Sequence, residues 1–295
     1  MTMENIFSSN QPKTPKIPET SIKPPRQTSD GKYAGQNIID LIDITQEYDD
    51  GKVKVFDKLK MEIKDINNKG QFITIMGASG CGKSTILRYI SGLQKPSSGK
   101  ILFHGKELTE KDHIPMVFQQ YSSFPWKTVL ENVMLPLNMI GIPEEETKKR
   151  ALSMLKVVGL NGHENKWAQY PLLSGGQLQR VAIARNLVAN PNVLLMDEPF
   201  GALDILTRRQ MQVFMRKIFE DNNDLDPTII LVTHDIREAV FLSTNIIILG
   251  DSPVRVKNII DVDLPDVRDM YLKRHPKFLE YVNMIEDIME NLKKS

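Results

Sequence analysis

The fold is decided by nine consecutive residues, Gly77-Ala78-Ser79-Gly80-Cys81-Gly82-Lys83-Ser84-Thr85. A short β-branched run, Phe72 to Met76, leads into this stretch, and a helix-like segment, Lys83 to Ile90, leads out of it. The glycines allow backbone angles that turn successive N–H groups inward, and the helix adds its positive N-terminal end. A strand, a G-x-x-x-x-G-K-[ST] loop and a helix in this order predict a binding site for the phosphates of a nucleotide.

All residues of this loop are expected to contribute to phosphate binding, and two of its side chains have chemical roles. Lys83 is expected to reach the β- and γ-phosphates, and the Ser84 hydroxyl is expected to bind Mg²⁺. Cys81 lies inside the loop, where the adjacent helix N-terminus favours its thiolate; a buried, inert thiol is the alternative. The loop alone indicates only an NTPase, because GTPases, kinases and helicases share it.

Two carboxylates follow a second apolar run. Val193-Leu194-Leu195-Met196 ends in Asp197 and Glu198. Taken alone, such a pair is more often the start of a loop than a catalytic site, but its position downstream of the phosphate loop favours catalysis. Asp197 is expected to hold Mg²⁺, directly or through water, and Glu198 is expected to polarise the attacking water as general base.

A pair of glycines opens another helix-like segment. Leu173-Ser174-Gly175-Gly176-Gln177 precedes a helical pattern that reaches Leu187, so backbone N–H groups again lie at a positive helix end. Nothing in the sequence suggests a second loop of the first kind. The motif is therefore expected to cover the γ-phosphate that another subunit binds.

Apolar runs and helical patterns alternate along the rest of the chain. Runs at Val193 to Met196, Ile229 to Thr233 and Ile246 to Leu249 suit strands that are buried on both faces. Helical patterns dominate from about residue 124 to 190, and another helical stretch lies near Pro276 to Leu292. Together they predict an α/β core with a helical insertion.

Composition limits where such a protein can act. A formal net charge of +1 gives no electrostatic drive toward nucleic acid or an anionic membrane. A single cysteine excludes an internal disulfide framework and fits a reducing compartment. The apolar stretches are far shorter than the ~20 residues of a membrane-spanning helix, and Met1 to Asn5 does not begin a secretory signal. A soluble intracellular protein is expected, whose membrane role would come through a partner.

The motifs and their order resemble those of the ATP-binding-cassette ATPases, from about Ile38 to Pro265. The resemblance implies ATP and Mg²⁺ as ligands and hydrolysis at the interface of two nucleotide-binding subunits. It also implies that Tyr48 is the A-loop aromatic that stacks on adenine, and that Gln119 is the catalytic Q-loop glutamine that binds Mg²⁺ and water. Ser174 to Gln177 would form the signature, Asp204 would belong to the D-loop, and His234 would be the H-loop switch histidine. Taken alone, Tyr48 would be strand packing and His234 a surface or capping histidine.

With this resemblance, the expected fold is a P-loop NTPase core with a mixed sheet, an N-terminal antiparallel β subdomain and an inserted α-helical signature subdomain at about 124–190. The expected domains are a disordered, proline-rich tail at 1–36, the ATPase domain at 37–265 and a C-terminal helical extension at 266–295.

Three segments resemble importer ATPases of the nitrate, sulfonate and taurine type: Phe124 to Val133, Glu198 to Asp204 and Ile260 to Pro265. The resemblance implies a second copy of the chain or a paralogous ATPase subunit as partner. It also implies transmembrane permease subunits and, through them, a solute-binding protein. The expected location is the cytoplasmic face of the inner membrane, as a peripheral subunit. For Trp126, local packing in the helical insertion is the alternative role.

Two other functions compete with transport. A cassette ATPase that acts on DNA or ribosomes would carry a long coiled coil before the signature, or two cassettes in one chain. The segment from Thr85 to Ser174 is too short for the first, and this chain has one cassette; its near-neutral charge also disfavours nucleic acid. A regulatory module without turnover would not need Glu198 and His234.

Overall fold

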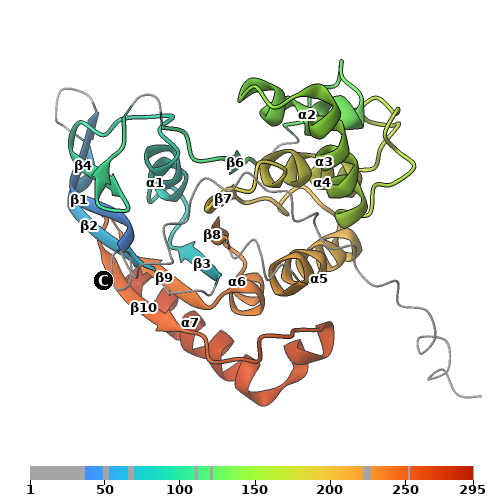
Figure 1. Ribbon diagram of the computed structural model, residues 1–295. Coiled ribbons are helices and arrows are strands. Elements are labelled where there is room, and N and C mark those ends of the chain that lie inside the picture. The colour runs from blue at the N-terminus through green and yellow to red at the C-terminus, as the bar shows by residue number, and fades with distance from the viewer. Residues whose placement is uncertain are drawn as a thin grey trace, which may run out of the picture.

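Two sheets form the framework of the molecule (Figure 1). The computed structural model describes residues 37–48, 53–65, 70–109, 112–119, 122–221, 227–251 and 253–294, and the tail predicted at 1–36 lies outside them. The first sheet has the order β2 (Val53–Lys64), β1 (Asn37–Tyr48), β4 (Ser98–Phe103) and β5 (Lys106–Glu107). Its strands are all antiparallel, which confirms the predicted N-terminal antiparallel sheet.

The second sheet is mixed, as predicted. Its order is β10 (Val256–Asp261), β9 (Asn245–Leu249), β3 (Gln71–Met76), β8 (Thr228–Val232), β7 (Val193–Asp197) and β6 (Met116–Val117). Neighbouring strands are parallel except β10, which pairs antiparallel with β9. Because the carboxyl ends of parallel strands meet at one edge of a sheet, the segments that follow β3, β7 and β8 all begin at the same edge.

Alternate residues of the central strands enter two different hydrophobic clusters. Successive side chains of a strand point to opposite faces of its sheet. One cluster takes Phe72, Leu194, Met196, Ile229 and Leu231, and the other takes Ile73, Ile75, Val193, Leu195, Ile230 and Val232. Burial on both faces explains why these strands read as continuous apolar runs in the sequence.

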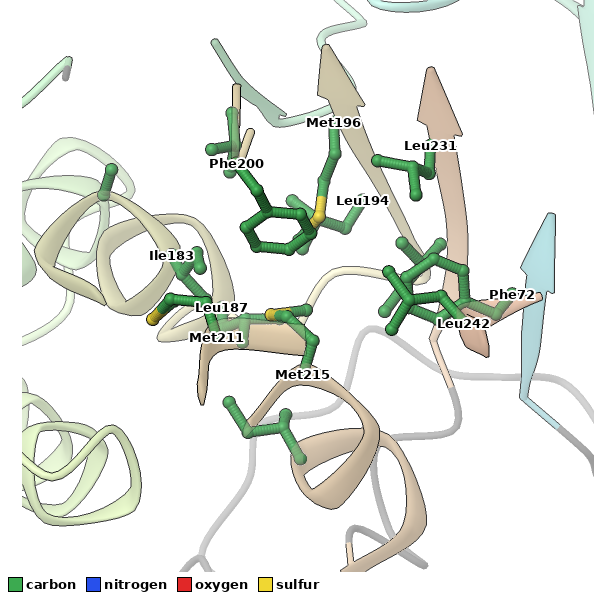
Figure 2. Close-up of a cluster of buried hydrophobic side chains, with 14 of the residues drawn as sticks. Phe72, Ile183, Leu187, Leu194, Met196, Phe200, Met211, Met215, Leu231 and Leu242 are labelled. Atoms are coloured by element: carbon green, nitrogen blue, oxygen red, sulfur yellow. The ribbon is translucent and has the colours of Figure 1, made fainter. Parts of the chain in front are cut away.

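Helices cover the first face of the mixed sheet. Figure 2 shows side chains of α4 (Gly175–Leu187), α5 (Ile205–Asp221) and α6 (Ile236–Leu242) meeting Phe72 and Leu194 of the sheet. On the other face, α1 (Lys83–Ile90) shares the second cluster with the antiparallel sheet. The helix predicted to follow the phosphate loop therefore lies where the sequence places it.

The helical insertion comprises α2 (Val129–Met139), α3 (Glu144–Val157) and α4, and Figure 1 shows it on the side of the molecule away from the antiparallel sheet. Thr128 and Glu131 start α2 as a capping box, in which the Glu131 N–H donates to Thr128 Oγ1 at 3.2 Å and the Thr128 N–H to Glu131 Oε2 at 2.7 Å. Such a box satisfies two backbone donors that the helix itself leaves unpaired.

The C-terminal segment consists of the 3-10 helix η2 (Met270–Arg274) and α7 (Pro276–Lys294). α7 buries Phe278, Val282 and Ile285 in the first hydrophobic cluster. Among the residues that the structure describes, no helix is long and apolar enough to cross a membrane.

Arg268 fastens the C-terminal segment to the end of α6. This side chain is 4% exposed, and its Nη1 donates to the carbonyl oxygens of Val240, Phe241 and Ser243 at 3.1, 3.0 and 2.9 Å. The last carbonyls of a helix have no partner within it, and a cation at this end also interacts favourably with the helix dipole.

Replacing Arg268 with alanine should lower the free energy of unfolding by about 2–4 kcal/mol, because buried carbonyls would lose a charged donor. Thermal unfolding followed by calorimetry measures the loss. Arg274→Ala, at an exposed position of η2, is the matched control and should change the stability by less than about 0.5 kcal/mol. Equal stability of Arg268→Ala and the unsubstituted chain would show that this cap contributes nothing.

Candidate functional site

The phosphate loop between β3 and α1 follows a path that demands glycine. Gly82 has φ +91°, a left-handed conformation that side chains rarely adopt. A Cβ at Gly82 would lie 2.4 Å from the Cζ of Phe56, so the ring of Phe56 closes the space above this position. A Cβ at Gly77 would lie 2.8 Å from the Sγ of Cys81. The loop is therefore both wound tightly on itself and packed against β2.

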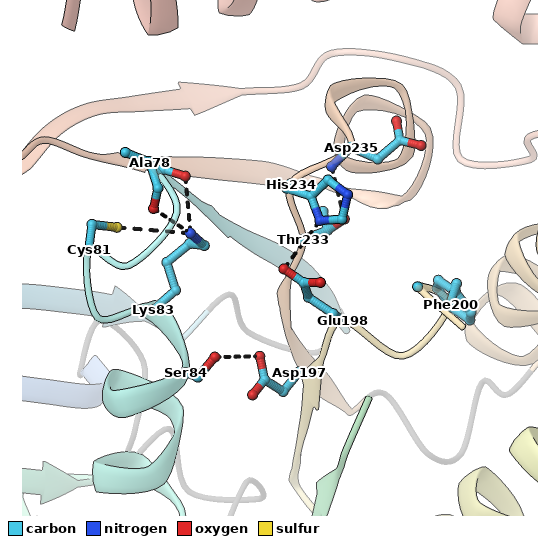
Figure 3. Close-up of polar contacts among 12 residues, drawn as sticks. Ala78, Cys81, Lys83, Ser84, Asp197, Glu198, Phe200, Thr233, His234 and Asp235 are labelled. Carbon is cyan, nitrogen blue, oxygen red and sulfur yellow. Dashed lines mark hydrogen bonds and ion pairs between the residues drawn. The ribbon is translucent and has the colours of Figure 1, made fainter. Parts of the chain in front are cut away.

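Lys83 extends back over the loop that precedes it (Figure 3). Its Nζ donates to the carbonyl oxygens of Gly77 at 3.0 Å and Ala78 at 2.7 Å. The side chain is 7% exposed, so the ammonium is held where anionic phosphates would lie in the loop. This geometry fits the predicted role of Lys83 in phosphate binding.

Ser84 and Asp197 meet across the gap between α1 and β7. The Ser84 hydroxyl donates to Asp197 Oδ1 at 2.9 Å (Figure 3). Burial raises the pKa of the Asp197 carboxyl above its ordinary value, and the hydrogen bond from Ser84 opposes that shift. Hydroxyl and carboxylate oxygens are ligands that Mg²⁺ prefers, and a site of so few protein ligands is completed by substrate phosphates and water. The two residues thus fit the predicted Mg²⁺ site.

Glu198 and His234 follow the carboxyl ends of the neighbouring strands β7 and β8. His234 Nδ1 is 3.2 Å from Glu198 Oε1 (Figure 3). Glu198 has φ +44° and its N–H donates to the Val232 carbonyl at 2.9 Å, so the backbone turns out of β7 at this residue while it remains attached to β8. A non-glycine residue held in this conformation stores strain of about 1–2 kcal/mol. Such strain is a recurring feature of functional positions.

Gln119 lies beside Glu198 at the same edge. Its Nε2 is 3.3 Å from the position that a Cβ on Gly201 would take, and Glu198 Oε2 is 3.7 Å from that position. The structure therefore brings residues from four separate segments of the chain to one edge of the mixed sheet. These residues are Lys83 and Ser84, Gln119, Asp197 and Glu198, and His234.

Ser174 starts α4, and its motif belongs to a second group of predicted site residues. The Gln177 N–H donates to Ser174 Oγ at 3.3 Å, the Ser174 N–H donates to Gln177 Oε1 at 2.8 Å, and Gln177 Nε2 lies 3.1 Å from His163 Nε2. Gly176 faces α5, because a Cβ there would lie 2.5 Å from the Cγ2 of Thr207.

Asp204 caps the neighbouring helix. Its Oδ1 accepts from the N–H groups of Leu206 and Thr207, both at 3.0 Å. Hydrogen bonding from the Thr207 side chain, and then from these N–H groups, holds the pKa of the Asp204 carboxyl below its ordinary value. Gly175 follows Ser174 at the same end of α4. The residues predicted to form the signature and the D-loop thus gather where α4 and α5 begin.

Tyr48 ends β1, where its backbone pairs with Val53. Its side chain lies outside what the structure describes, so its role at adenine remains a prediction. Ser79, Gly80 and Thr85 occupy the loop and the first turn of α1.

Arg208 is a residue of this region that the sequence reasoning missed. Its guanidinium donates to the carbonyls of Phe200, Gly201 and Leu203 at 3.2, 3.3 and 3.2 Å, so it holds the loop that joins Glu198 to Asp204. A signal was present in the sequence, since a cation close to the N-terminus of a helix is unfavourable unless a specific partner holds it.

The Cys81 side chain contradicts the reactivity predicted for it. The thiol is 7% exposed, and burial raises its pKa above the ordinary value, an effect that the neighbouring Lys83 opposes. The prediction of a favoured thiolate is wrong because the loop winds the sulfur inward against Gly77. The thiol is buried, as the alternative of a buried, inert thiol expects, and its low reactivity stays a prediction.

Comparison with known proteins gives the family context of this site. The family model described as ABC transporter matches residues 61–201. An uncharacterized ABC transporter ATP-binding protein of Methanocaldococcus jannaschii is 42% identical over 83% of this chain and 88% of its own length. A nitrate import ATP-binding protein of Synechocystis is 40% identical over 77% of this chain and 87% of its own.

Other relatives carry different substrate names. An aliphatic sulfonates import ATP-binding protein of Shouchella clausii is 42% identical over 76% of this chain and 81% of its own. A spermidine/putrescine import ATP-binding protein of Clostridium novyi is 35% identical over 86% of this chain and 70% of its own. Among solved structures, a dimeric post-hydrolysis ATP-binding cassette bound to ADP and phosphate has a TM-score of 0.63 and 35% identity, and covers 77% of this chain and 100% of its own.

Because the folded thiol has a pKa above its unfolded value, less of Cys81 is thiolate at pH 7 in the native protein than in the unfolded chain. Maleimide should therefore label native Cys81 at least about 10-fold more slowly than the urea-unfolded chain, and the native rate should rise as the pH is raised above 8. Mass spectrometry reads a single site, since the chain has one cysteine, and Cys81→Ala supplies the blank. Labelling at equal rates in the two states would contradict this account of the loop.

Proposed function

Since this chain belongs to the ABC transporter family as one of its ATP-binding subunits, we propose that it powers import of a small anionic or organic solute through Glu198-dependent ATP hydrolysis. It is an ATPase, like the import ATP-binding proteins that it resembles. We assign a role in ATP hydrolysis to each site residue, a second subunit and a permease as partners, and a class of solute.

The observation that carries the proposal is the meeting of oppositely charged side chains at one edge of the mixed sheet. Lys83 lies over the phosphate loop, Ser84 and Asp197 are 2.9 Å apart, and Glu198 is 3.2 Å from His234. Such a group can neutralise phosphate, hold a divalent cation and activate water. A phosphate-binding lysine, a Mg²⁺ site made of a hydroxyl and an aspartate, and a residue that positions water recur in P-loop ATPases.

Each of these residues then has a defined role. The Lys83 ammonium offsets negative charge on the β- and γ-phosphates, and Mg²⁺ held by Ser84, Asp197 and Gln119 would neutralise the charge that develops there during transfer. The Glu198 carboxylate accepts the proton of the attacking water. The His234 imidazole, with its Nδ1 near Glu198, orients that carboxylate and contacts the γ-phosphate.

A second subunit would complete the cage around the γ-phosphate. Ser174 lies exposed at the N-terminus of α4, where backbone N–H groups favour an anion. Its own contacts are with Gln177 and, through that residue, with His163. A similar cassette solved as a dimer with ADP and phosphate supports a head-to-tail pair, in which each Ser174 motif faces the phosphate loop of the partner.

Exposed apolar side chains support docking onto a transmembrane permease. The segment near Trp126 is bonded to the segment near Trp167, through the N–H of Ala168 to the Lys127 carbonyl at 3.0 Å and the Ser123 hydroxyl to the Ala168 carbonyl at 3.2 Å. Side chains on these two segments are well exposed: Phe118 38%, Trp126 67%, Trp167 48%, Tyr170 78% and Leu172 49%. Exposed apolar patches of this kind mark interaction sites.

This surface favours an interaction role for Trp126 over local packing alone. Held there, the ATPase would be peripheral to the inner membrane at its cytoplasmic face. Gln119 and Trp126 are seven positions apart in the sequence. A movement of the permease at Trp126 would therefore also displace Gln119 at the catalytic edge of the sheet.

The solute is proposed from the relatives. The nitrate and sulfonate import ATP-binding proteins are 40% and 42% identical to this chain. Together with the segments Phe124 to Val133, Glu198 to Asp204 and Ile260 to Pro265, these relatives support a small anion or organic solute of the nitrate, sulfonate and taurine class, delivered by a solute-binding protein. The family match disfavours the alternative of a cassette ATPase that acts on DNA or ribosomes.

Glu198→Gln keeps the shape of the side chain but removes the basic carboxylate, so bound ATP should persist and hold two subunits together. With Mg-ATP this variant should elute as a dimer from a sizing column calibrated by light scattering, and with Mg-ADP mainly as a monomer. Its ATPase rate should fall at least about 100-fold.

Adding Ser174→Arg to that variant should abolish the dimer, because the larger charged side chain would occupy the place of the γ-phosphate. Lys217→Ala, at an exposed position of α5, is the control and should leave the dimer intact. If Glu198→Gln stays monomeric at high protein concentration with saturating Mg-ATP, or turns over at the unsubstituted rate, the proposed mechanism is wrong.

A further inference from the structure

A chain of three polar side chains, half-buried Lys273 and buried Gln212 and Glu238, lies next to the His234 loop and has no role in the mechanism above. Lys273 Nζ, on η2, donates to Gln212 Oε1, on α5, at 2.7 Å. Gln212 Nε2 in turn donates to Glu238 Oε2, on α6, at 2.8 Å. Gln212 and Glu238 are 2% and 3% exposed, so the amide and the carboxylate are held almost entirely away from water.

Glu238 holds the residues on both sides of His234. On one side, hydrogen bonding from the Thr233 side chain acts to lower the pKa of the Glu238 carboxyl. On the other, the Glu238 N–H donates to Asp235 Oδ1 at 3.0 Å, and the Asp235 N–H donates to Thr233 Oγ1 at 3.1 Å. The backbone that carries His234 is thus closed into a small ring of hydrogen bonds with Glu238 at its base.

His234 depends on this backbone for its position. Its side chain is 70% exposed, and the contact that places its ring is Nδ1 to Glu198 Oε1 at 3.2 Å. Because the ring is exposed, packing restrains its position little. The hydrogen bonds of the neighbouring backbone must therefore fix the position of His234. Fixing a catalytic group to within a fraction of an ångström is what supporting hydrogen bonds achieve.

The charges around Glu238 favour a specific role over bulk stability. Burial raises the pKa of the Glu238 carboxyl, and its hydrogen bonds with Gln212 and Thr233 oppose that shift. Burial lowers the pKa of the Lys273 ammonium, while Asp235 and Glu238 act to raise it. Lys273 also lies over the ring of Phe241, 4.7 Å from its centroid. A buried acid and its polar chain cost folding energy, and networks of this kind are retained where they fix one geometry.

We propose that Glu238 is a positioning residue for His234, and that Lys273 of the C-terminal segment acts on it through the Gln212 amide. Lys273 orients the amide by occupying its oxygen, which directs the amide nitrogen toward the Glu238 carboxylate. Glu238, fixed in this way, interacts with Thr233 through its carboxylate and holds Asp235 Oδ1 through its backbone N–H, and the two flanking residues position the histidine. The C-terminal segment is in this way coupled to the catalytic edge. The inference rests on the role of His234 in the proposed function.

The test compares steady-state ATP hydrolysis by full-length variants at saturating and limiting Mg-ATP. Lys273→Met keeps the length of the side chain over Phe241 but removes the cation. It should lower kcat about 3–10-fold and leave KM for Mg-ATP within about twofold, because Lys83 and the phosphate loop are untouched. Lys273→Arg should restore kcat to within about twofold of the unsubstituted chain.

Two comparisons separate this role from loss of a surface charge or of stability. Lys277→Met removes a cation from the same segment, where Lys277 Nζ pairs with Asp263 Oδ2 at 2.7 Å, and should leave kcat unchanged. In a Gln212→Leu background, Lys273→Met should change kcat by less than about twofold, since its route to Glu238 is already cut. Melting temperatures verify that each variant is folded at the assay temperature. If Gln212→Leu does not fold, the comparison of Lys273→Met, Lys273→Arg and Lys277→Met decides alone.

An unchanged kcat in Lys273→Met would overturn the proposal, and so would an equal loss in Lys273→Met and Lys277→Met, or a fully additive loss in the double variant. His234→Ala distinguishes this failure from that of the proposed function. If His234→Ala is inactive while Lys273→Met is normal, the positioning chain alone is wrong. If His234→Ala keeps full activity, the role of the histidine itself is wrong.

Discussion

The parallel register of β3, β7 and β8 is the constraint on which the catalytic arrangement depends. Ile75 of β3 and Asp197 of β7 are both paired with Val232 of β8, so the three strands end almost level. The phosphate loop starts at Gly77, one residue beyond Met76, while Glu198 and Thr233 are the first residues beyond the other two ends. Side chains separated by more than a hundred positions in sequence therefore meet. A shift of one strand by one residue would exchange its two faces and separate the groups.

Burial on both faces makes this register rigid. Each central strand contributes alternately to two hydrophobic clusters, one under α4 to α7 and one under α1 and the antiparallel sheet. Such strands cannot slide without exposing apolar surface on both sides at once. The same rigidity allows strained and desolvated groups at the edge. Glu198 keeps a left-handed backbone, Asp197 keeps a carboxyl whose pKa burial raises, and Lys83 keeps a buried ammonium over the loop. In the proposed function, bound phosphate would offset the cost of burying the Lys83 ammonium, and Mg²⁺ would offset the cost of burying the Asp197 carboxylate.

Local patterns allowed much of this to be predicted from the sequence. The helix Lys83–Ile90 was predicted with the bounds that the structure has, because a glycine-rich loop fixes its start and Gly92 its end. The buried strands β7, β8 and β9 were predicted from short apolar runs. Contacts between distant segments could not be read in this way. Arg208 holds the loop at Phe200 to Leu203, and Lys273 reaches Gln212 across 61 positions. The prediction for Cys81 was wrong for a similar reason. Its position at the N-terminus of a helix indicated a thiolate, but the winding of the loop buries the sulfur, and burial raises the pKa of the thiol.

The C-terminal segment contacts both ends of the short helix that follows His234. α6 begins two residues after His234, so any rotation of this short helix moves the histidine. Arg268 binds the carbonyls at the end of α6, and Lys273 reaches the Glu238 near its start through Gln212. Both residues lie within one stretch of chain that precedes α7, whose apolar face is in turn buried in the main cluster. The helix is therefore held at both ends by a segment outside the phosphate-binding motifs. It follows that the backbone of the His234 loop is fixed by buried contacts, while the exposed ring lies beside Glu198, where the proposed function has it contact the nucleotide.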